Sequence, residues 1–369
     1  MFKVGIVAPG HFKRLAAEVG FLHAYYEACQ KGFPLPDYMT GVSAGGIAIA
    51  CAAQWTEDDF RRTEEILLGL KRKHFYGINP KLEVIGGLAG LAALGVMLPT
   101  EKIKNPWLRY GTKAAIACTI LGMDKTFVEG LLQSDAIFST KLYKFLEGKL
   151  RIDRILGSPI NIEIASVDVN NRTFSVVSNF RPEDQKPEIL LNGIVDSTRL
   201  PVFFPFRRDE HGHYLADDAA LSNVPIHLAR NHGCDVIIVL KFCCAGEGPI
   251  VKEYDEWGSE LQRFIDIMVD ENARKTMRDY EFFNNDLEQE EKIQRAIQLL
   301  EDCEARRILE RVKLSASGRR KIKLIVVDSE EIPEFHFSSF STEATRQSMN
   351  IGYKAFFSVQ DQIAQAIGL

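Results

Sequence analysis

A Gly-Val-Ser-Ala-Gly pentapeptide at 41–45 constrains the fold of this chain more than any other feature. It lies between an apolar segment, 37–42, typical of a buried strand, and an Ala- and Ile-rich segment, 44–54, typical of a buried helix. Small residues on both sides of Ser43 allow the chain to turn sharply and leave the serine oxygen exposed above the sheet edge. The amino terminus of the following helix adds positive potential at the same place. The sequence therefore predicts a nucleophile elbow at Ser43, against the alternative that so short a pattern arises by chance.

The segments before this elbow predict a repeating order of strand and helix. Residues 2–8 form a short apolar run, and residues 14–31 carry apolar side chains at helical spacing. With the strand at 37–42 and the helix at 44–54, the order is strand, helix, strand, helix. This is the order of a right-handed parallel unit, in which ligands bind beyond the carboxyl ends of the strands.

The rest of the chain divides into an insertion and a second group of strands. From about 56 to 150 the pattern becomes helical and irregular, and we expect this partly apolar insertion to act as a cap. Strand signals return afterwards, at 160–167, 173–178, 236–242 and 323–327. Between the last two, residues 255–312 form a charged stretch in which Glu and Arg recur at helical spacing.

We interpret the chain as one α/β domain, 1–369. Its core motifs lie in 1–240, its helical insertion at about 56–150, and a charged helical C-terminal part at about 250–369.

The composition excludes several classes of function. Lys and Arg total 45 against 50 Asp and Glu, and no long block of one sign is present, which disfavours a surface for nucleic acid. The seven cysteines include no Cys-x-x-Cys pair, so neither a disulfide framework nor a zinc site is expected. P-loop, His-Glu-x-x-His and EF-hand spacings are absent. We therefore expect no cofactor, no catalytic metal and no nucleic-acid partner, and we see no secretory signal, which favours a cytoplasmic protein.

Five motifs in order resemble those of the patatin-like phospholipases, lipid acyl hydrolases that use a Ser-Asp dyad. Besides the pentapeptide they are a Gly-Phe-Leu helix segment, a strand end, a Pro- and Phe-containing segment and an Asp segment closed by Asn-x-Pro. These lie at 20–22, 166–169, 196–205 and 214–225, and a weaker echo lies at 341–357.

The resemblance implies a three-layer α/β/α sandwich around a central, mostly parallel sheet. It also implies hydrolysis of carboxylic ester bonds in phospholipids or other acyl lipids through an acyl-serine intermediate.

The resemblance also assigns site residues. Ser43 stands in the position of the nucleophile and Asp217 in that of the catalytic aspartate. Asp218 stands where the family has glycine, so the two carboxylates remain alternatives, although the frame set by Asn223-Val224-Pro225 favours Asp217. The other assignments are the oxyanion N–H groups of Gly10, His11, Phe12 and Ala44, loop support by Arg14, and the elbow glycines Gly41 and Gly45.

Departures from the family leave other hypotheses open. The family's Gly-Gly-Gly-x-Arg-Gly loop reads Gly-His-Phe-Lys-Arg-Leu at 10–15, which loses the positive φ that glycine permits. The chain could therefore be a catalytically impaired lipid-binding or scaffold protein on the same fold. His11 is either a further donor to the oxyanion or a plain loop residue. A third hypothesis is a Ser-His-Asp esterase or acyltransferase with a soluble substrate, whose histidine would be His211, His213, His227, His232 or His336.

An uncharged run at 84–99 is either ordinary core or an apolar cap that touches a bilayer. As a helix it would be about 24 Å long, shorter than the ~30 Å hydrocarbon layer. Basic and aromatic residues follow it at 102–113, a mixture suited to lipid headgroups. The family resemblance implies an acyl-lipid substrate, peripheral membrane contact stays open, and no particular protein partner is predicted.

Overall fold

The structure is a computed structural model that describes most of the chain outside the insertion. The described residues are 2–70, 77–78, 138–139, 142–200, 206–218, 223–242, 257–299, 321–327, 329, 331–333 and 341–369. The uncharged run 84–99 and the residues at 102–113 lie outside them.

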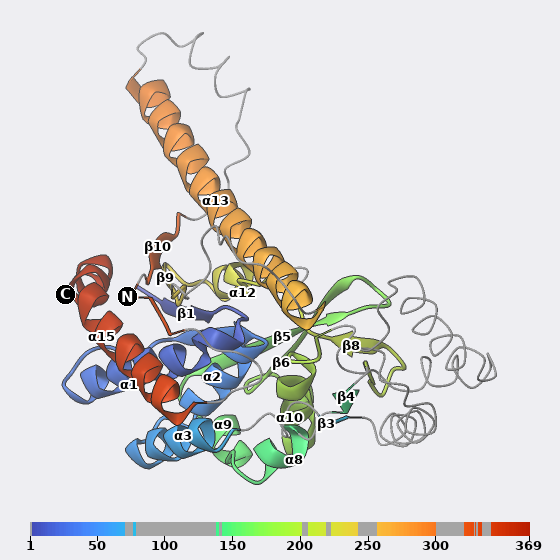
Figure 1. The fold of residues 1–369 in the computed structure, drawn as a ribbon. Coiled ribbons are helices and arrows are strands. Elements are labelled where there is room, and N and C mark those ends of the chain that lie inside the picture. Colours follow the sequence, from blue (N-terminus) through green and yellow to red (C-terminus); the bar gives the residue numbers. More distant parts are fainter. Residues whose placement is uncertain are drawn as a thin grey trace, which may run out of the picture.

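The elements of the described residues are coloured along the chain in Figure 1. They are β1 (Val4–Ala8), η1 (Phe12–Arg14), α1 (Leu15–Gln30), β2 (Tyr38–Val42), α2 (Ala44–Ala52), α3 (Glu57–Gly69), β3 (Gly77–Ile78), β4 (Phe138–Ser139), α8 (Leu142–Glu147), α9 (Ile152–Leu156), β5 (Asn161–Asp168), β6 (Thr173–Ser178), η3 (Pro182–Asp184), α10 (Pro187–Asp196), β7 (Arg207–Arg208), β8 (Tyr214–Ala216), α12 (Ile226–Asn231), β9 (Val236–Val239), α13 (Trp257–Leu299), β10 (Lys323–Val326) and α15 (Thr342–Ile367).

A mostly parallel sheet forms the middle layer. Its strand order is β10-β9-β1-β2-β5-β8-β7, and β6 also pairs with β5. The strands β10, β9, β1, β2 and β5 are all parallel, whereas β6 and β8 run antiparallel to β5. The carboxyl ends of the five parallel strands therefore lie along one edge of the sheet.

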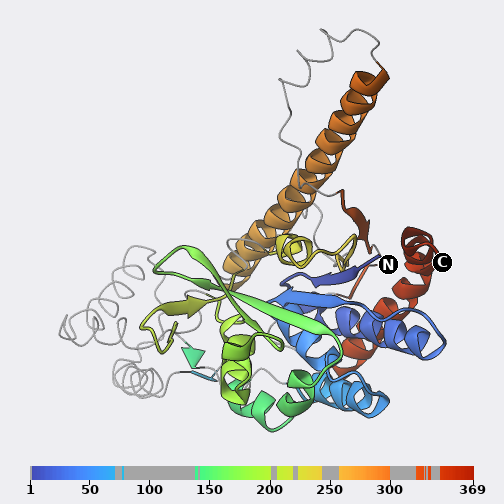
Figure 2. The same ribbon diagram turned by 180° about the vertical axis from the view of Figure 1, so that it is seen from behind.

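Alternate residues of the parallel strands face two separate helical layers. In β1, Ile6 packs with α1, α2 and α15 on one face, whereas Val7 packs with α12 and α13 on the other. Ile238 and Ile237 of β9 divide in the same way. This period of two is the geometry of an extended strand whose faces are both buried. Figures 1 and 2 show the sheet between these layers, so the expected three-layer α/β/α sandwich is confirmed.

Two glycines allow α1 and α15 to pack in direct backbone contact. A Cβ on Gly20 would lie 2.0 Å from the Met349 carbonyl oxygen, and one on Gly352 would lie 1.8 Å from that of Ala17. Only hydrogen fits at either position, so the Gly-Phe-Leu segment of α1 has a packing role. α15 itself was visible in the sequence only as the weak echo at 341–357.

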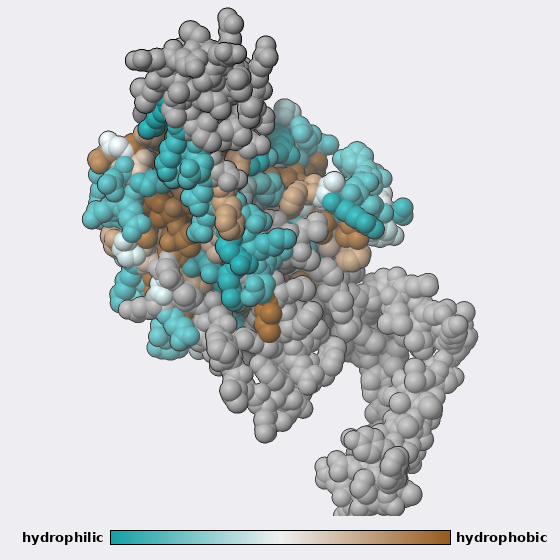
Figure 3. Space-filling view, turned by 90° about the horizontal axis from the view of Figure 1, so that it is seen from above, coloured by the Kyte–Doolittle hydropathy of each residue, from teal (hydrophilic) through white to brown (hydrophobic). Residues whose placement is uncertain are grey.

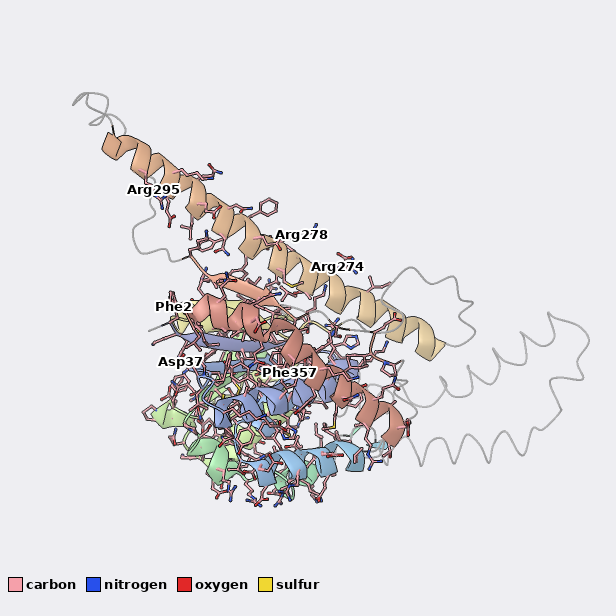
Figure 4. The ribbon with its side chains drawn as sticks, turned by 90° about the vertical axis from the view of Figure 1, so that its left-hand side faces the viewer. Phe2, Asp37, Arg274, Arg278, Arg295 and Phe357 are labelled. Atoms are coloured by element: carbon pink, nitrogen blue, oxygen red, sulfur yellow. The ribbon has the colours of Figure 1, made fainter. Side chains whose placement is uncertain are left out.

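The helix α13 has 43 residues, which makes it about 65 Å long. Its first half packs on the sheet side through Ala273 and Met277, and farther along Asn284 exchanges two hydrogen bonds with the backbone of Ile322. In Figure 4, Arg274 and Arg278 mark the part over the body and Arg295 lies toward the far end. The charged stretch at 255–312 thus contains one long helix, and its residues after 299 lie outside those described.

Outside the insertion, the strands and helices expected from periodicity are confirmed, with ends that shift by a few residues. Most of the insertion expected at about 56–150, and with it the expected cap, lies outside the described residues. The structure adds α10 and the β7–β8 hairpin, for which no strand or helix pattern had been identified. From above, hydrophilic residues cover much of the described surface, with hydrophobic residues in separate patches (Figure 3). Within the described ranges, no helix is long and apolar enough to cross a bilayer.

Candidate active site

Ser43 lies in a strained turn between β2 and α2. Its φ of 54° and ψ of −123° fall in a region that side-chain-bearing residues rarely adopt. A Cβ on Gly41 would lie 2.5 Å from the Gly45 carbonyl, and one on Gly45 would lie 2.2 Å from the Ala8 oxygen. Both glycines are therefore required for the turn to close, and the turn has the sharp shape of an elbow. The Ser43 side chain is half-buried and hydrogen-bonds no described residue.

The pairing of β5 shows which strand continues beyond the end of β2. One edge of β5 pairs with β6 up to Asp168, and the other pairs with β2 up to Ala165. β8 pairs with Val167 and Asp168, where β6 already occupies the first edge. Because a strand has only two edges, β8 must lie on the same edge of β5 as β2, just past the end of β2.

The ends of β2 and β8 therefore meet head to head. Val42 lies opposite Ala165 of β5, and Ala216 of β8 lies opposite Val167. The two chain ends are two β5 residues apart, about 7 Å at the usual rise of a strand. Ser43 follows the first end and Asp217 follows the second, so two residues far apart in sequence converge at one point.

The two neighbouring aspartates differ in environment. Continued alternation along β8 directs Asp217 to the layer of α2, where Ser43 lies, and Asp218 to the opposite layer. Asp218 is fully buried, and its carboxyl oxygens have no hydrogen-bond partner among the described residues. Burial raises the pKa of Asp218 to about 9, and the charge of Asp217 adds to that shift. Asp218 is therefore protonated at neutral pH and has no basic lone pair to offer.

The backbone of Asp217 is held by an anchored segment. Its N–H donates to the Arg199 carbonyl at 3.0 Å. The side chain of Arg199 donates to the buried Asp196 at 3.1 Å, and Arg207 donates to both carboxylate oxygens of Asp196. This ion-pair cluster at the end of α10 anchors Arg199, whose carbonyl accepts the N–H of Asp217.

The loop after β1 follows a path that suits ordinary residues. His11 is extended, at φ −170° and ψ 118°, and no residue from 10 to 14 has positive φ. The lost glycines are therefore not needed for this path. Gly10 itself remains necessary, because a Cβ there would lie 2.6 Å from Asn223 Oδ1 and 3.0 Å from Ser43 Cβ. The loop thus runs directly beside the serine.

One of the four N–H groups assigned to the oxyanion is already engaged. Gly10 N donates to the Asn223 carbonyl oxygen at 3.2 Å. In this structure Gly10 leaves space beside Ser43, and its N–H is held by the backbone. His11 and Phe12 follow it in the loop, and Ala44 begins α2, where N–H groups of the first turn lack a partner within the helix.

Arg14 connects the ends of two strands. Its side chain is fully buried, and Nε donates to the Phe242 carbonyl oxygen at 2.9 Å. Because Phe242 comes just after β9, this bond ties the loop after β1 to the chain after the neighbouring strand. This bond restrains the loop after β1.

The downstream histidines are dispersed. His232 stacks on Tyr38 at the start of β2, which is the end opposite Ser43. His213 belongs to the β7–β8 hairpin and lies 3.0 Å from Asp168 of β5. No described histidine hydrogen-bonds Ser43. The other candidates are His211, which is exposed, His227, which packs on Phe174, and His336, which lies outside the described residues. Among the described residues, no cluster of His, Cys, Asp and Glu could hold a metal ion.

The fold is that of an α/β protein with a mostly parallel sheet, and a strained serine turn and an aspartate lie where β2 and β8 end along β5. A family model for the patatin-like phospholipases matches residues 10–230, more than half of the chain. This protein belongs to that family, whose members are in general lipid acyl hydrolases.

Two further comparisons add little. The crystal structure of VipD from Legionella pneumophila aligns over 98% of this chain and 67% of its own, at 14% identity and a TM-score of 0.41. A likeness this loose carries no functional weight. A comparison with curated proteins finds no match.

Proposed function

We propose that this protein hydrolyses carboxylic ester bonds of phospholipids or other acyl lipids, with Ser43 as nucleophile and Asp217 as base. The observation that carries the proposal is the convergence of the strained Ser43 turn and Asp217 where β2 and β8 meet along β5. Strain of this kind costs about 1–3 kcal/mol and is typical of functional sites. Family membership supports the acyl-lipid substrate class.

In the first half of the reaction, Ser43 Oγ attacks the ester carbonyl carbon and its proton passes to Asp217. The carbonyl π electrons move to the oxygen, which becomes a tetrahedral oxyanion. Collapse of this adduct breaks the bond to the alcohol, which takes the proton from Asp217 and leaves. The product on the protein is an ester of Ser43.

In the second half, Asp217 takes a proton from water and the hydroxide attacks the acyl carbon. The second oxyanion collapses, Ser43 Oγ regains the proton, and the carboxylic acid departs. Asp218 stays protonated throughout, because burial and the charge of Asp217 hold its pKa at about 9. Before each proton transfer the pair thus carries one negative charge, on Asp217, and while Asp217 holds the proton it carries none.

Backbone N–H groups of His11, Phe12 and Ala44 are the proposed donors to the oxyanion. Such donors act strongly when they are fixed before the reaction. Arg14 supports this arrangement through its bond to the Phe242 carbonyl. The extended conformation of His11 favours an active loop over the impaired scaffold, because the altered sequence adopts it without backbone strain.

The experiment combines covalent labelling with turnover. Wild-type protein is incubated with a fluorophosphonate probe, and with phosphatidylcholine vesicles and a short p-nitrophenyl ester as substrates. Ser43→Ala should abolish labelling and hydrolysis of both, whereas Ser358→Ala, an exposed serine of α15, should leave them unchanged. Folded wild-type protein that is neither labelled nor active would refute the hydrolase and favour a scaffold.

Contact with a membrane surface is a separate part of the proposal. Peripheral binding would bring the site to its lipid substrate without a membrane-spanning segment. Flotation of the intact protein with vesicles that contain anionic lipid tests this contact. Equal flotation with and without vesicles would reject it, while leaving the ester chemistry to the labelling experiment.

A further inference from the structure

Asn223 has a buried side-chain amide with no partner. The residue precedes α12, its side chain is fully buried, and neither Oδ1 nor Nδ2 has a hydrogen-bond partner in the described structure. An amide buried in this way forgoes its bonds to water, which costs about 1–3 kcal/mol. Buried polar groups are almost always satisfied, so an unsatisfied one calls for a reason. The sequence analysis used Asn223 only to set the frame for Asp217.

The amide lies next to the nucleophile. A Cβ built on Gly10 would lie 2.6 Å from Asn223 Oδ1 and 3.0 Å from Ser43 Cβ, so those two atoms are at most about 5.6 Å apart. In a tetrahedral adduct the oxyanion lies about 3 Å from the serine Cβ, and an effective donor lies 2.7–3.1 Å beyond it. The upper bound on the distance from Asn223 Oδ1 to Ser43 Cβ is therefore compatible with the distance required of an oxyanion donor.

The same residue also removes a donor from the loop. Its carbonyl oxygen accepts the Gly10 N–H at 3.2 Å, which takes that group away from any substrate. A half-turn about χ2 exchanges the positions of Oδ1 and Nδ2, and it breaks no hydrogen bond because neither atom makes one. The Asn223 amide can therefore present its NH2 group where the loop has lost an N–H.

The backbone of Asn223 is fixed on two sides. Its carbonyl accepts from Gly10, and its N–H donates to Asn272 Oδ1 of α13 at 3.3 Å. Figures 1 and 2 both show the start of α13 beside β5 and β8, over the region that holds the site. A side chain on so restrained a backbone is oriented before substrate arrives, which is the condition for electrostatic stabilisation of a transition state.

We propose that Asn223 is a catalytic residue whose side-chain Nδ2 donates a hydrogen bond to the oxyanion formed at Ser43. The inference rests on the proposed ester hydrolysis and adds a side-chain donor to the backbone donors of the loop. It also gives the buried, unsatisfied amide its partner: the amide is satisfied only while the oxyanion exists. This differential contact is what accelerates a reaction.

The test compares turnover with the binding of a transition-state mimic. A trifluoromethyl ketone adds to the serine as a hemiketal anion and so reports on the oxyanion site. Asn223→Ala should lower kcat for the p-nitrophenyl ester by about 10²–10³, the range for loss of one oxyanion donor, with KM nearly unchanged. Its affinity for the ketone should fall by a similar factor. Asn350→Ala, an exposed asparagine of α15, should change neither quantity.

A second variant guards against a simple folding defect. Asn223→Leu has nearly the same shape, has no donor, and breaks no side-chain hydrogen bond within the described structure. It should reproduce the losses of Asn223→Ala while retaining the thermal transition. Wild-type kcat and ketone affinity in either folded variant would overturn the proposal, and so would loss of the thermal transition in both, which would mark Asn223 as structural.

Failure of this inference is distinguishable from failure of the hydrolase proposal. Wild-type protein that hydrolyses esters through Ser43 but is indifferent to the Asn223 variants rejects only the role of Asn223. Wild-type protein without labelling or turnover rejects both.

Discussion

Asp218 should make the stability of this protein fall as pH rises. Burial raises the pKa of its carboxyl to about 9 in the folded protein, whereas an aspartate in an unfolded chain titrates near 3.9. Between these values the folded protein keeps a proton that the unfolded chain releases, so the free energy of unfolding decreases with increasing pH. One proton corresponds to about 1.4 kcal/mol per pH unit, or about 4 kcal/mol between pH 5 and pH 8.

Asp218→Asn removes this proton linkage while preserving the shape of the side chain. Its stability relative to wild type should therefore increase by about 4 kcal/mol from pH 5 to pH 8, which is roughly 5 °C in melting temperature for a chain of this size. Scanning calorimetry at fixed ionic strength across that range measures the difference. Asp153→Asn, at an exposed aspartate of α9, serves as the control and should give a curve parallel to wild type.

Parallel curves for wild type and Asp218→Asn would refute the reasoning. They would show that the carboxyl is ionised in the folded protein and that a partner compensates its burial. When Asp217→Asn is also present, the effect of Asp218→Asn on stability should change less between pH 5 and pH 8. The reason is that the charge of Asp217 contributes to the raised pKa of Asp218.

The remaining predictions concern the elbow, the base and the helix contact. Ser43→Gly should abolish ester hydrolysis, and its melting temperature should lie above that of Ser43→Ala. Glycine adopts a φ of 54° without the strain of about 1–3 kcal/mol that other residues bear there. Equal melting temperatures for the two variants would show that the turn is unstrained. Asp217→Asn should lower kcat at least about a hundredfold and Asp218→Asn by less, and kinetics with the opposite ranking would exchange their roles. Gly352→Ala should destabilise the protein by about 1–3 kcal/mol, because its methyl group would meet a carbonyl oxygen at 1.8 Å; an unchanged denaturation midpoint would contradict the close packing of α1 and α15.

Much of the fold could be predicted from periodicity. The buried strands are continuous apolar runs, and the elbow has small residues at the positions where the chain crowds itself, as the contact of Gly41 with Gly45 shows. The hairpin of β7 and β8 was less visible, because its strands have two and three residues. Their pairing depends on the free part of the β5 edge beyond β2, which is a property of the assembled sheet.

The candidate site could be predicted only in part, because some of its features also depend on the assembled sheet. Ser43 is defined by its immediate neighbours in sequence, whereas the choice between Asp217 and Asp218 depends on strand alternation and burial. The buried amide of Asn223 was missed because nothing in an Asn-x-Pro sequence indicates that the side chain lacks a partner. The engaged N–H of Gly10 was missed as well, since its acceptor comes from a segment more than two hundred positions away.

The head-to-head meeting of β2 and β8 has a kinetic consequence. Neither strand touches its counterpart through ladder hydrogen bonds, and only β5 holds both in register. The contact closes a loop of well over a hundred residues, and contacts with such separation bear a large entropic penalty before they gain any stabilisation. The candidate site is therefore expected among the last parts of the molecule to assemble. During refolding, recovery of ester turnover should lag behind recovery of the helical circular dichroism signal.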